Sequence, residues 1–230
     1  MKILFAPSEA KSLGGDDEKR EFCFDIDRNE ILKTYDYFVK NANKESLKKL
    51  FGTKELLDID IFNSPTKKAI KRYTGVAYEY LDYASLDEEA KIFLENNLII
   101  FSNLFGMLCA KDKIPFYKLK QGEAIGDLKP EKYYKEKCKN IKIEDEILDL
   151  RAGFYEKFYK PPFCVKMKFL KNGKTVSHWA KAYRGKIARE IAKNQIDTFQ
   201  KLKSHPFKDL KLIEIQQKRD HEMWIFEIVE

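Results

Sequence analysis

Ser8 and Lys11 lie three residues apart near the N-terminus, where a hydroxyl and an amine could act on the same group. Ser-x-x-Lys is the spacing of the serine–lysine nucleophile in some acyl-transfer enzymes, in which both residues lie on one helical turn. Here Pro7 and the pair Gly14-Gly15 favour a loop instead. The segment is therefore better suited to binding an anion than to nucleophilic attack.

Other polar residues follow predicted strands or helix starts in the same way. Asp149 and Arg151 lie at the end of a predicted strand, Tyr155 on the next predicted helix, and Lys181 beside a predicted helix start. Together with Ser8 they suit a pocket for a nucleotide or another phosphorylated small molecule. The pattern does not separate binding from catalysis, so we assign no catalytic residue and favour a binding protein over an enzyme.

The segment AKAYRGKIAREIAKN, residues 180–194, combines a basic face with an apolar face. At helical spacing, Lys186, Arg189 and Lys193 share one outward arc, opposite the isoleucines and alanines of the segment. We expect residues 181–184 to form a loop and the helix to open at Gly185. The loop cations would then lie beside unpaired N–H donors, a place that favours phosphate or carboxylate. Alternatively, these cations pair with acidic side chains of the same protein.

The composition is that of a globular, basic protein. The 230 residues are 43% apolar, and 44 Lys+Arg against 37 Asp+Glu give a formal net charge of +7. This length and apolar content suit a single domain, residues 1–230. The positive charge fits a polyanionic partner such as nucleic acid, or else a lysine-rich proteome with no such partner.

The cysteines and histidines give no sign of a metal or cofactor. Cys23, Cys109, Cys138 and Cys164 are scattered without a C-x-x-C pair, and the three histidines lack metal-ligand spacing. We therefore predict no metal site, no disulfide framework and no cofactor. No apolar run has the length of a membrane span or signal peptide, which predicts a cytoplasmic protein without a membrane partner.

Hydrophobic periodicity predicts alternating strands and helices, and hence an α/β fold with a mixed sheet flanked by helices. Asn172-Gly173 is the favoured turn of a β-hairpin, and two alternating runs near the C-terminus should pair antiparallel. Strands are predicted at residues 2–6, 98–104, 147–150, 210–215 and 222–229, and helices at 29–41, 43–51, from Ser85 and Glu88 to about 95, after Pro130, and from 185.

Two helix ends carry specific expectations. Ser85 and Glu88 have the spacing of a capping box. Gly52 is placed to end one helix and Thr53 to cap another short one, so helices joined at residues 50–53 suit either a helix-hairpin-helix element or an ordinary helical pair.

Several blocks, taken in order, resemble the YaaA peroxide-stress family, formerly a family of unknown function. They are ILFAPSEAKSLG, YTGVAYEYL followed by FSNLFGMLCAKDKIPFYKLKQG, then LDLRAGFYEKFY and HWAKAYRGKIAREI, and they extend from residue 3 to about 191. Two departures stand out, since the family's Leu-Arg-Pro is here Leu108-Cys109-Ala110 and its Tyr-Arg-Leu is Tyr117-Lys118-Leu119. Lysine keeps the charge but loses the planar fork of arginine.

The resemblance implies specific site residues. The family's polar residues match Ser8, Lys11, Asp112, Tyr117, Asp149, Arg151, Tyr155, Lys181 and Arg189, and its glycines match Gly75, Gly106 and Gly185. It also implies an unusual topology with a helix-hairpin-helix-like element and a basic cleft, DNA binding, and a cytosolic role in surviving peroxide by limiting free intracellular iron.

These considerations predict a DNA-binding stress protein that contacts the DNA backbone and shape rather than a base sequence. The alternatives are the phosphorylated-ligand pocket and a scaffold whose basic face docks an acidic protein. The phosphate-binding candidates are Lys11, Lys118, Lys120, Lys181, Arg184, Lys186 and Arg189. The candidates for a pocket that binds a small anion are Ser8, Asp112, Tyr117, Asp149, Arg151, Tyr155 and Gly185.

Overall fold

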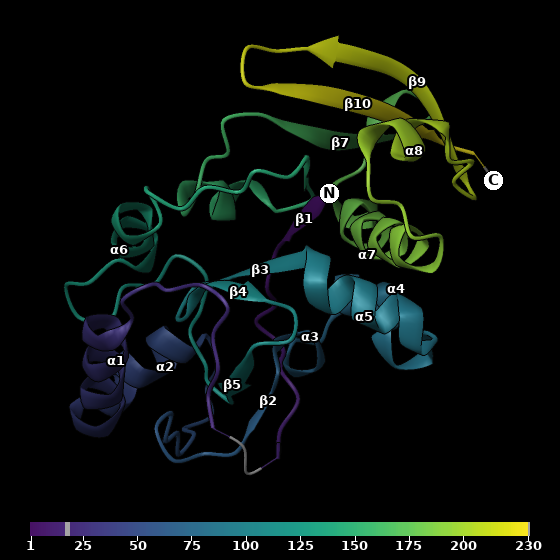
Figure 1. Cartoon of the computed structure of the whole chain (residues 1–230). Helices are drawn as coiled ribbons and strands as arrows, with labels where there is room; N and C mark the ends of the chain where they lie inside the picture. The colour runs from purple at the N-terminus through teal and green to yellow at the C-terminus, as the bar shows by residue number, and fades with distance from the viewer. Residues whose placement is uncertain (17–18, 230) are drawn as a thin grey trace.

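An eight-stranded mixed sheet forms the centre of the computed structural model, which describes residues 1–16 and 19–229 (Figure 1). A separate two-stranded sheet pairs β2 (Thr66–Lys68) with β5 (Lys113–Pro115). The strands of the main sheet are β1 (Lys2–Phe5), β3 (Leu98–Ser102), β4 (Gly106–Cys109), β6 (Ile147–Asp149), β7 (Cys164–Lys171), β8 (Lys174–Thr175), β9 (Leu210–Gln217) and β10 (His221–Ile228).

The strand order is β4-β3-β1-β6-β7-β10-β9, with β8 paired to β7. The five inner strands from β3 to β10 are parallel, and β4 and β9 add antiparallel edges. A strand that is covered on both faces has a nearly continuous apolar sequence. The segment LIIFS of β3 is such a strand, and all five of its residues are buried. The predicted mixed α/β architecture is therefore confirmed.

Most of the connections between these strands contain helices. The connections from β1 to β3 and from β4 to β6 are the longest. Figure 1 shows α7 running beside α4, below the strands of the C-terminal part of the sheet. The helices are α1 (Asn29–Asn41), α2 (Lys44–Phe51), α3 (Ala69–Arg72), α4 (Val76–Leu81), α5 (Glu88–Asn97), α6 (Pro130–Lys137), α7 (Ser177–Lys193) and α8 (Phe199–Ser204), with short 3₁₀ helices at Tyr83–Ser85 and Gly153–Lys157. In the part of the chain that is described, no helix combines the length and apolarity needed to cross a bilayer.

Several local predictions are confirmed. Residues 29–41 form α1, Asn43 caps α2 by accepting a hydrogen bond from the Ser46 N–H, and Pro130 opens α6. The turn between β7 and β8 has positive φ at both Asn172 (51°) and Gly173 (72°), as the predicted hairpin requires. The C-terminal runs pair antiparallel as β9 and β10.

Two predicted helix starts are wrong. Asp87, not Ser85, caps α5, because its carboxylate accepts the Ala90 N–H at 2.8 Å while the Ser85 hydroxyl bonds back to Asp82. Gly52 does end α2 in the left-handed conformation, but residues 53–65 contain no helix. Thr53 therefore caps nothing, and the helix-hairpin-helix element expected there is not confirmed.

The predicted start of the helix within residues 180–194 is also wrong, by eight residues. α7 begins at Ser177 and includes Lys181, Arg184 and Gly185 in its interior. Tyr183 continues the buried stripe and stacks on Phe169 at 5.5 Å between ring centroids, so tertiary packing keeps this turn helical. The N–H groups near Gly185 are consequently not the free donors of a helix start.

Candidate functional site

A pocket of about 280 Å³ opens at the carboxyl ends of β1 and β6. β1 lies between β3 and β6, because the chain crosses from β1 to β3 on one side and later from β4 to β6 on the other. Open parallel sheets bind ligands at such a switch point, because the loops diverge there and leave a crevice. The pocket is lined by Phe5, Ala6, Pro7, Ser8, Glu9, Thr74, Gly75, Val76, Ala77, Tyr78, Gln121, Leu150, Ala152, Tyr155, Lys181 and Arg184.

The floor of the pocket depends on close packing of Gly75 against Ser8. Gly75 has a φ of 97°, and a Cβ at this position would lie 2.9 Å from the Ser8 Oγ. Ser8 Oγ accepts the Ala10 N–H at 3.2 Å, which turns the chain after Pro7. Glycine is therefore needed both for the backbone conformation and for space beside the serine.

Two cations one turn apart on α7 form the wall of the pocket. Lys181 is exposed and Arg184 is half-buried. Burial lowers the pKa of Arg184, and the carboxylates of Asp149 and Glu156 oppose this shift. Within the described residues, neither side chain makes a hydrogen bond or an ion pair. Arg184 therefore presents a desolvated fork of N–H donors, which suits an oxyanion.

Lys11 and Lys118 lie on either side of the Glu9 backbone carbonyl at the rim of this site. Both ammonium groups donate to the Glu9 oxygen at 3.4 Å, and Lys11 also donates to the Ser8 carbonyl at 3.0 Å. Lys11 stands 4.2 Å from the centre of the Tyr117 ring. Burial, reinforced by the charge of Lys118, lowers the pKa of Lys11 to about 7.

The lowered pKa of Lys11 predicts a specific pH dependence of stability. Above pH 7 the unfolded chain holds a proton on Lys11 that the folded chain has released, so raising the pH favours folding until the ordinary value of 10.5 is reached. We expect wild type to gain up to about 1.4 kcal/mol per pH unit relative to Lys11→Met over this interval. Urea unfolding of both proteins from neutral to alkaline pH measures the difference, and a constant difference would contradict the assignment.

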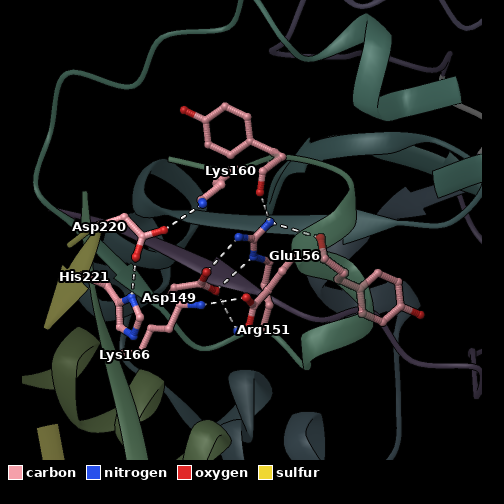
Figure 2. A network of polar contacts seen from close by, with 9 residues as sticks. Asp149, Arg151, Glu156, Lys160, Lys166, Asp220 and His221 are labelled. Atoms are coloured by element: carbon pink, nitrogen blue, oxygen red, sulfur yellow. Dashed lines mark hydrogen bonds and ion pairs between the residues drawn. The ribbon is translucent and has the colours of Figure 1, made fainter. Parts of the chain in front are cut away.

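Asp149 and Arg151 lie behind the pocket in a buried ion pair (Figure 2). Arg151 Nη2 and Nε donate to the two Asp149 oxygens at 2.7 and 2.9 Å, and Nη1 donates to the carbonyls of Tyr155 and Tyr159. The guanidinium thus fixes the turn that carries Tyr155 to the pocket wall. These two charges satisfy one another, and they position the site without lining it.

Figure 2 also shows further polar contacts around this pair, made mostly by half-buried side chains. Lys166 bonds Glu156 at 2.6 Å, and Asp220 contacts both Lys160 and His221. The Lys160 ammonium, followed by His221, lowers the pKa of Asp220 well below its usual range. The network ties β10 to the segment after β6.

Tyr117 and Asp112 have structural partners away from the pocket. The Tyr117 hydroxyl is buried among Tyr73, Ser102 and Asn103 at 2.9 to 3.1 Å. The Asp112 carboxylate accepts two backbone N–H groups. Neither side chain reaches the pocket lining.

The other predicted phosphate contacts point elsewhere. Arg189 donates to the Leu81 and Asp82 carbonyls and to the Ser85 hydroxyl, at 2.8 to 3.0 Å. Lys186 pairs with Asp209 at 3.5 Å, and Lys120 lies 3.7 Å from Glu123. The outward arc of α7 is therefore partly neutralised within the fold, whereas the ion pairs expected as an alternative for Lys181 and Arg184 are not found among the described residues.

Glu9 and Gln121 belong to the pocket although sequence patterns did not indicate them. The Gln121 N–H donates to the Glu9 carboxylate at 3.0 Å and joins the loop after β1 to the segment after β5. The only signal for either residue is its place in a block that resembles a family motif. Gly185, by contrast, contributes by letting α7 approach α4 closely.

These features define an α/β protein with a pocket at the switch point of a mixed sheet, lined on one side by Lys181 and Arg184 of α7. A family model described as Peroxide stress protein YaaA matches residues 1–215, and the chain therefore belongs to the YaaA family. The uncharacterized protein Cj0984 of Campylobacter jejuni is 45% identical to it over the whole of both chains. A UPF0246 protein of Corynebacterium glutamicum is 31% identical over 84% of this chain and 85% of its own.

Proposed function

We propose that this YaaA-family protein acts in the peroxide stress response by binding DNA, with α7 holding a backbone phosphate at the switch-point pocket. The observation that carries the proposal is the half-buried Arg184 guanidinium, which lines the pocket and makes no hydrogen bond or ion pair with the described residues. Lys181 lies one turn earlier on the same helix, and Lys118 lies at the rim of the site, where it donates to the Glu9 carbonyl. Among the described residues Lys181 and Arg184 make no hydrogen bond or ion pair and are available to neutralise phosphates, whereas Lys186 and Arg189 are engaged.

The proposed mode of binding is a basic cleft that follows the DNA backbone. The exposed Lys181, on the same helix, would extend the phosphate track beyond Arg184. Because no helix among the described residues presents an Arg/Asn/Gln face for reading bases, selectivity should come from DNA shape. A link to limiting free iron stays a prediction from the resemblance, because the described pocket lining contains neither cysteine nor histidine.

Fluorescence anisotropy with duplex, gapped and single-stranded DNA across a salt series tests this proposal. We expect Lys181→Ala/Arg184→Ala to weaken binding about tenfold or more and to make the salt slope shallower by about 2, one for each phosphate that is no longer neutralised. The matched control, Lys186→Ala/Lys193→Ala, removes two charges from the same helix and should change the affinity less than about threefold. Equal losses in both variants would contradict a specific role for the pocket.

A pocket for a nucleotide-sized anion is the second candidate, favoured by the concave shape of the site and by Ser8 and Tyr155 in its wall. Under this alternative, wild type binds no DNA even at low salt. Nucleoside phosphates would instead raise its melting temperature, and Arg184→Ala would abolish that shift.

A further inference from the structure

Two cysteines and one aspartate, from two distant parts of the sequence, meet beside a surface pocket. The Sγ atoms of Cys23 and Cys109 and a carboxylate oxygen of Asp112 all lie within 4.8 Å of one another. Cys23 belongs to the loop before α1, Cys109 ends β4, and Asp112 precedes β5. The two cysteines are 86 positions apart (109 − 23), so no local spacing motif in the sequence indicates the cluster.

Hydrogen bonds to the main chain hold the carboxylate of this cluster in place. Asp112 Oδ1 accepts the Cys23 N–H at 3.0 Å, and Oδ2 accepts the Cys109 N–H at 3.0 Å. The aspartate is 2% exposed. Each carboxylate oxygen has two acceptor sites. The Cys23 side chain also hydrogen-bonds to this carboxylate, a contact that a shared metal ion would replace. The same two residues therefore supply the thiols and fix the carboxylate beside them.

Solvent reaches the cluster through a pocket of about 310 Å³ lined by Cys23, Asp112, Lys68, Lys111 and Glu95, among others. The Cys23 side chain is exposed and Cys109 is half-buried. Lys68 is already paired with Glu95 at 2.7 Å. An ion can therefore enter from the Cys23 side without displacing a packed side chain.

We propose that Cys23, Cys109 and Asp112 bind a thiophilic divalent cation of the zinc type, with the fourth coordination position open to the pocket. Two sulfurs and one carboxylate oxygen are a ligand set that zinc accepts, and three protein ligands with one open position are its usual arrangement outside closed structural sites.

The distances and charges fit this ligand set. Tetrahedral Zn–S bonds of about 2.3 Å place two sulfurs about 3.8 Å apart, so donors within 4.8 Å need to close by about 1 Å at most. The exposed Cys23 side chain can make that adjustment. Two thiolates and a carboxylate around a dication leave one net negative charge, which Lys111 and Arg28 lie near enough to offset.

Zinc titration of the reduced, metal-free full-length chain, with a chromophoric chelator as competitor, tests the site. Wild type should bind one equivalent, and Cys23→Ala should bind at least about 100-fold more weakly because it removes a ligand. Cys164→Ala, which removes a buried thiol elsewhere, is the matched control and should keep full affinity. Co²⁺ in place of zinc should give a thiolate charge-transfer band in wild type that Cys23→Ala lacks.

Stability measurements separate loss of binding from loss of folding. Cys23 is exposed, so Cys23→Ala should melt like metal-free wild type, and zinc should raise the melting temperature of wild type but not of this variant. Asp112→Asn is a less informative variant because the amide keeps a single acceptor oxygen for two N–H groups. Zinc binding of equal strength in wild type and Cys23→Ala, or its loss in Cys164→Ala, would overturn the proposal.

Discussion

Replacing Gly185 with alanine is expected to destabilise the protein by about 3 kcal/mol or more, although alanine is the better helix former. A Cβ at this position would stand 2.1 Å from the Ala77 carbonyl oxygen and 3.0 Å from the Leu81 nitrogen. Both are backbone atoms of α4, so no side-chain rotation can relieve the clash. The two helices would have to separate, and the well-packed interface between them would open.

The same substitution should also damage the pocket. Gly75, Val76 and Ala77 line it from the α4 side, and Lys181 and Arg184 line it from α7. A displacement of α7 away from α4 therefore moves the cations away from Ser8. We expect DNA affinity to fall together with stability in Gly185→Ala.

Thermal and urea unfolding measure the Gly185 effect, with a melting temperature expected to fall by about 6 to 12 °C for a chain of this size. The matched control is Gly153→Ala, because a Cβ at Gly153 meets nothing within 4 Å. This control should be neutral within about 0.5 kcal/mol. If Gly185→Ala were as stable as Gly153→Ala, the result would contradict the close packing of α7 against α4.

The packing of Gly185 explains why the sequence pattern places the start of α7 too late. Glycine has a low helix propensity, so local sequence favours a helix that begins at Gly185 over one that runs through it. What keeps residues 177–184 helical is contact with α4 and with Phe169 of β7, partners that are distant in the sequence. The periodic part of the helix needs no such information, and its predicted core residues Ile187 and Ile191 are buried.

The site could be predicted in part, and the division has a physical reason. Ser8, Tyr155 and Lys181 do meet at one pocket, because residues that follow parallel strands collect at one edge of the sheet. Whether a polar side chain at that edge faces the pocket or the core depends on its partners, which the sequence does not show. Tyr117 and Arg151 also belong to the matched sequence blocks, but their side chains are engaged in hydrogen bonds inside the fold.

Net charge misleads for a related reason. Arg28 and Arg72 are buried and donate to backbone carbonyls, Arg28 to Phe105 and Met107 and Arg72 to Ser12 and Gly14. These guanidinium groups supply hydrogen-bond donors to backbone carbonyls inside the fold. Composition counts them with the cations that face a ligand, so the surplus of +7 overstates what a polyanion meets at the surface.

Arg151→Met is expected to cost about 3 to 5 kcal/mol of unfolding free energy. The substitution leaves the Asp149 carboxylate buried without its cation and removes the guanidinium donor of the Tyr159 carbonyl, while the Tyr155 carbonyl keeps only the Phe158 N–H (Figure 2). The guanidinium also stacks 4.3 Å from the centre of the Phe101 ring, an interaction that methionine replaces only in part. The penalty comes mainly from the unpaired groups, because a charge out of water is costly when its partner is gone.

The double variant Asp149→Leu/Arg151→Met distinguishes the pair's net contribution from the penalty of breaking it. Removing both charges leaves no unpaired ion of this pair buried, so the double variant should be more stable than Arg151→Met, although the Tyr159 carbonyl still lacks the guanidinium donor. Urea unfolding of the wild type, both single variants and the double variant gives the coupling energy directly. A double variant less stable than wild type would show that the ion pair contributes net stability. A double variant less stable than Arg151→Met would contradict the expectation that the unpaired Asp149 carboxylate causes most of the penalty.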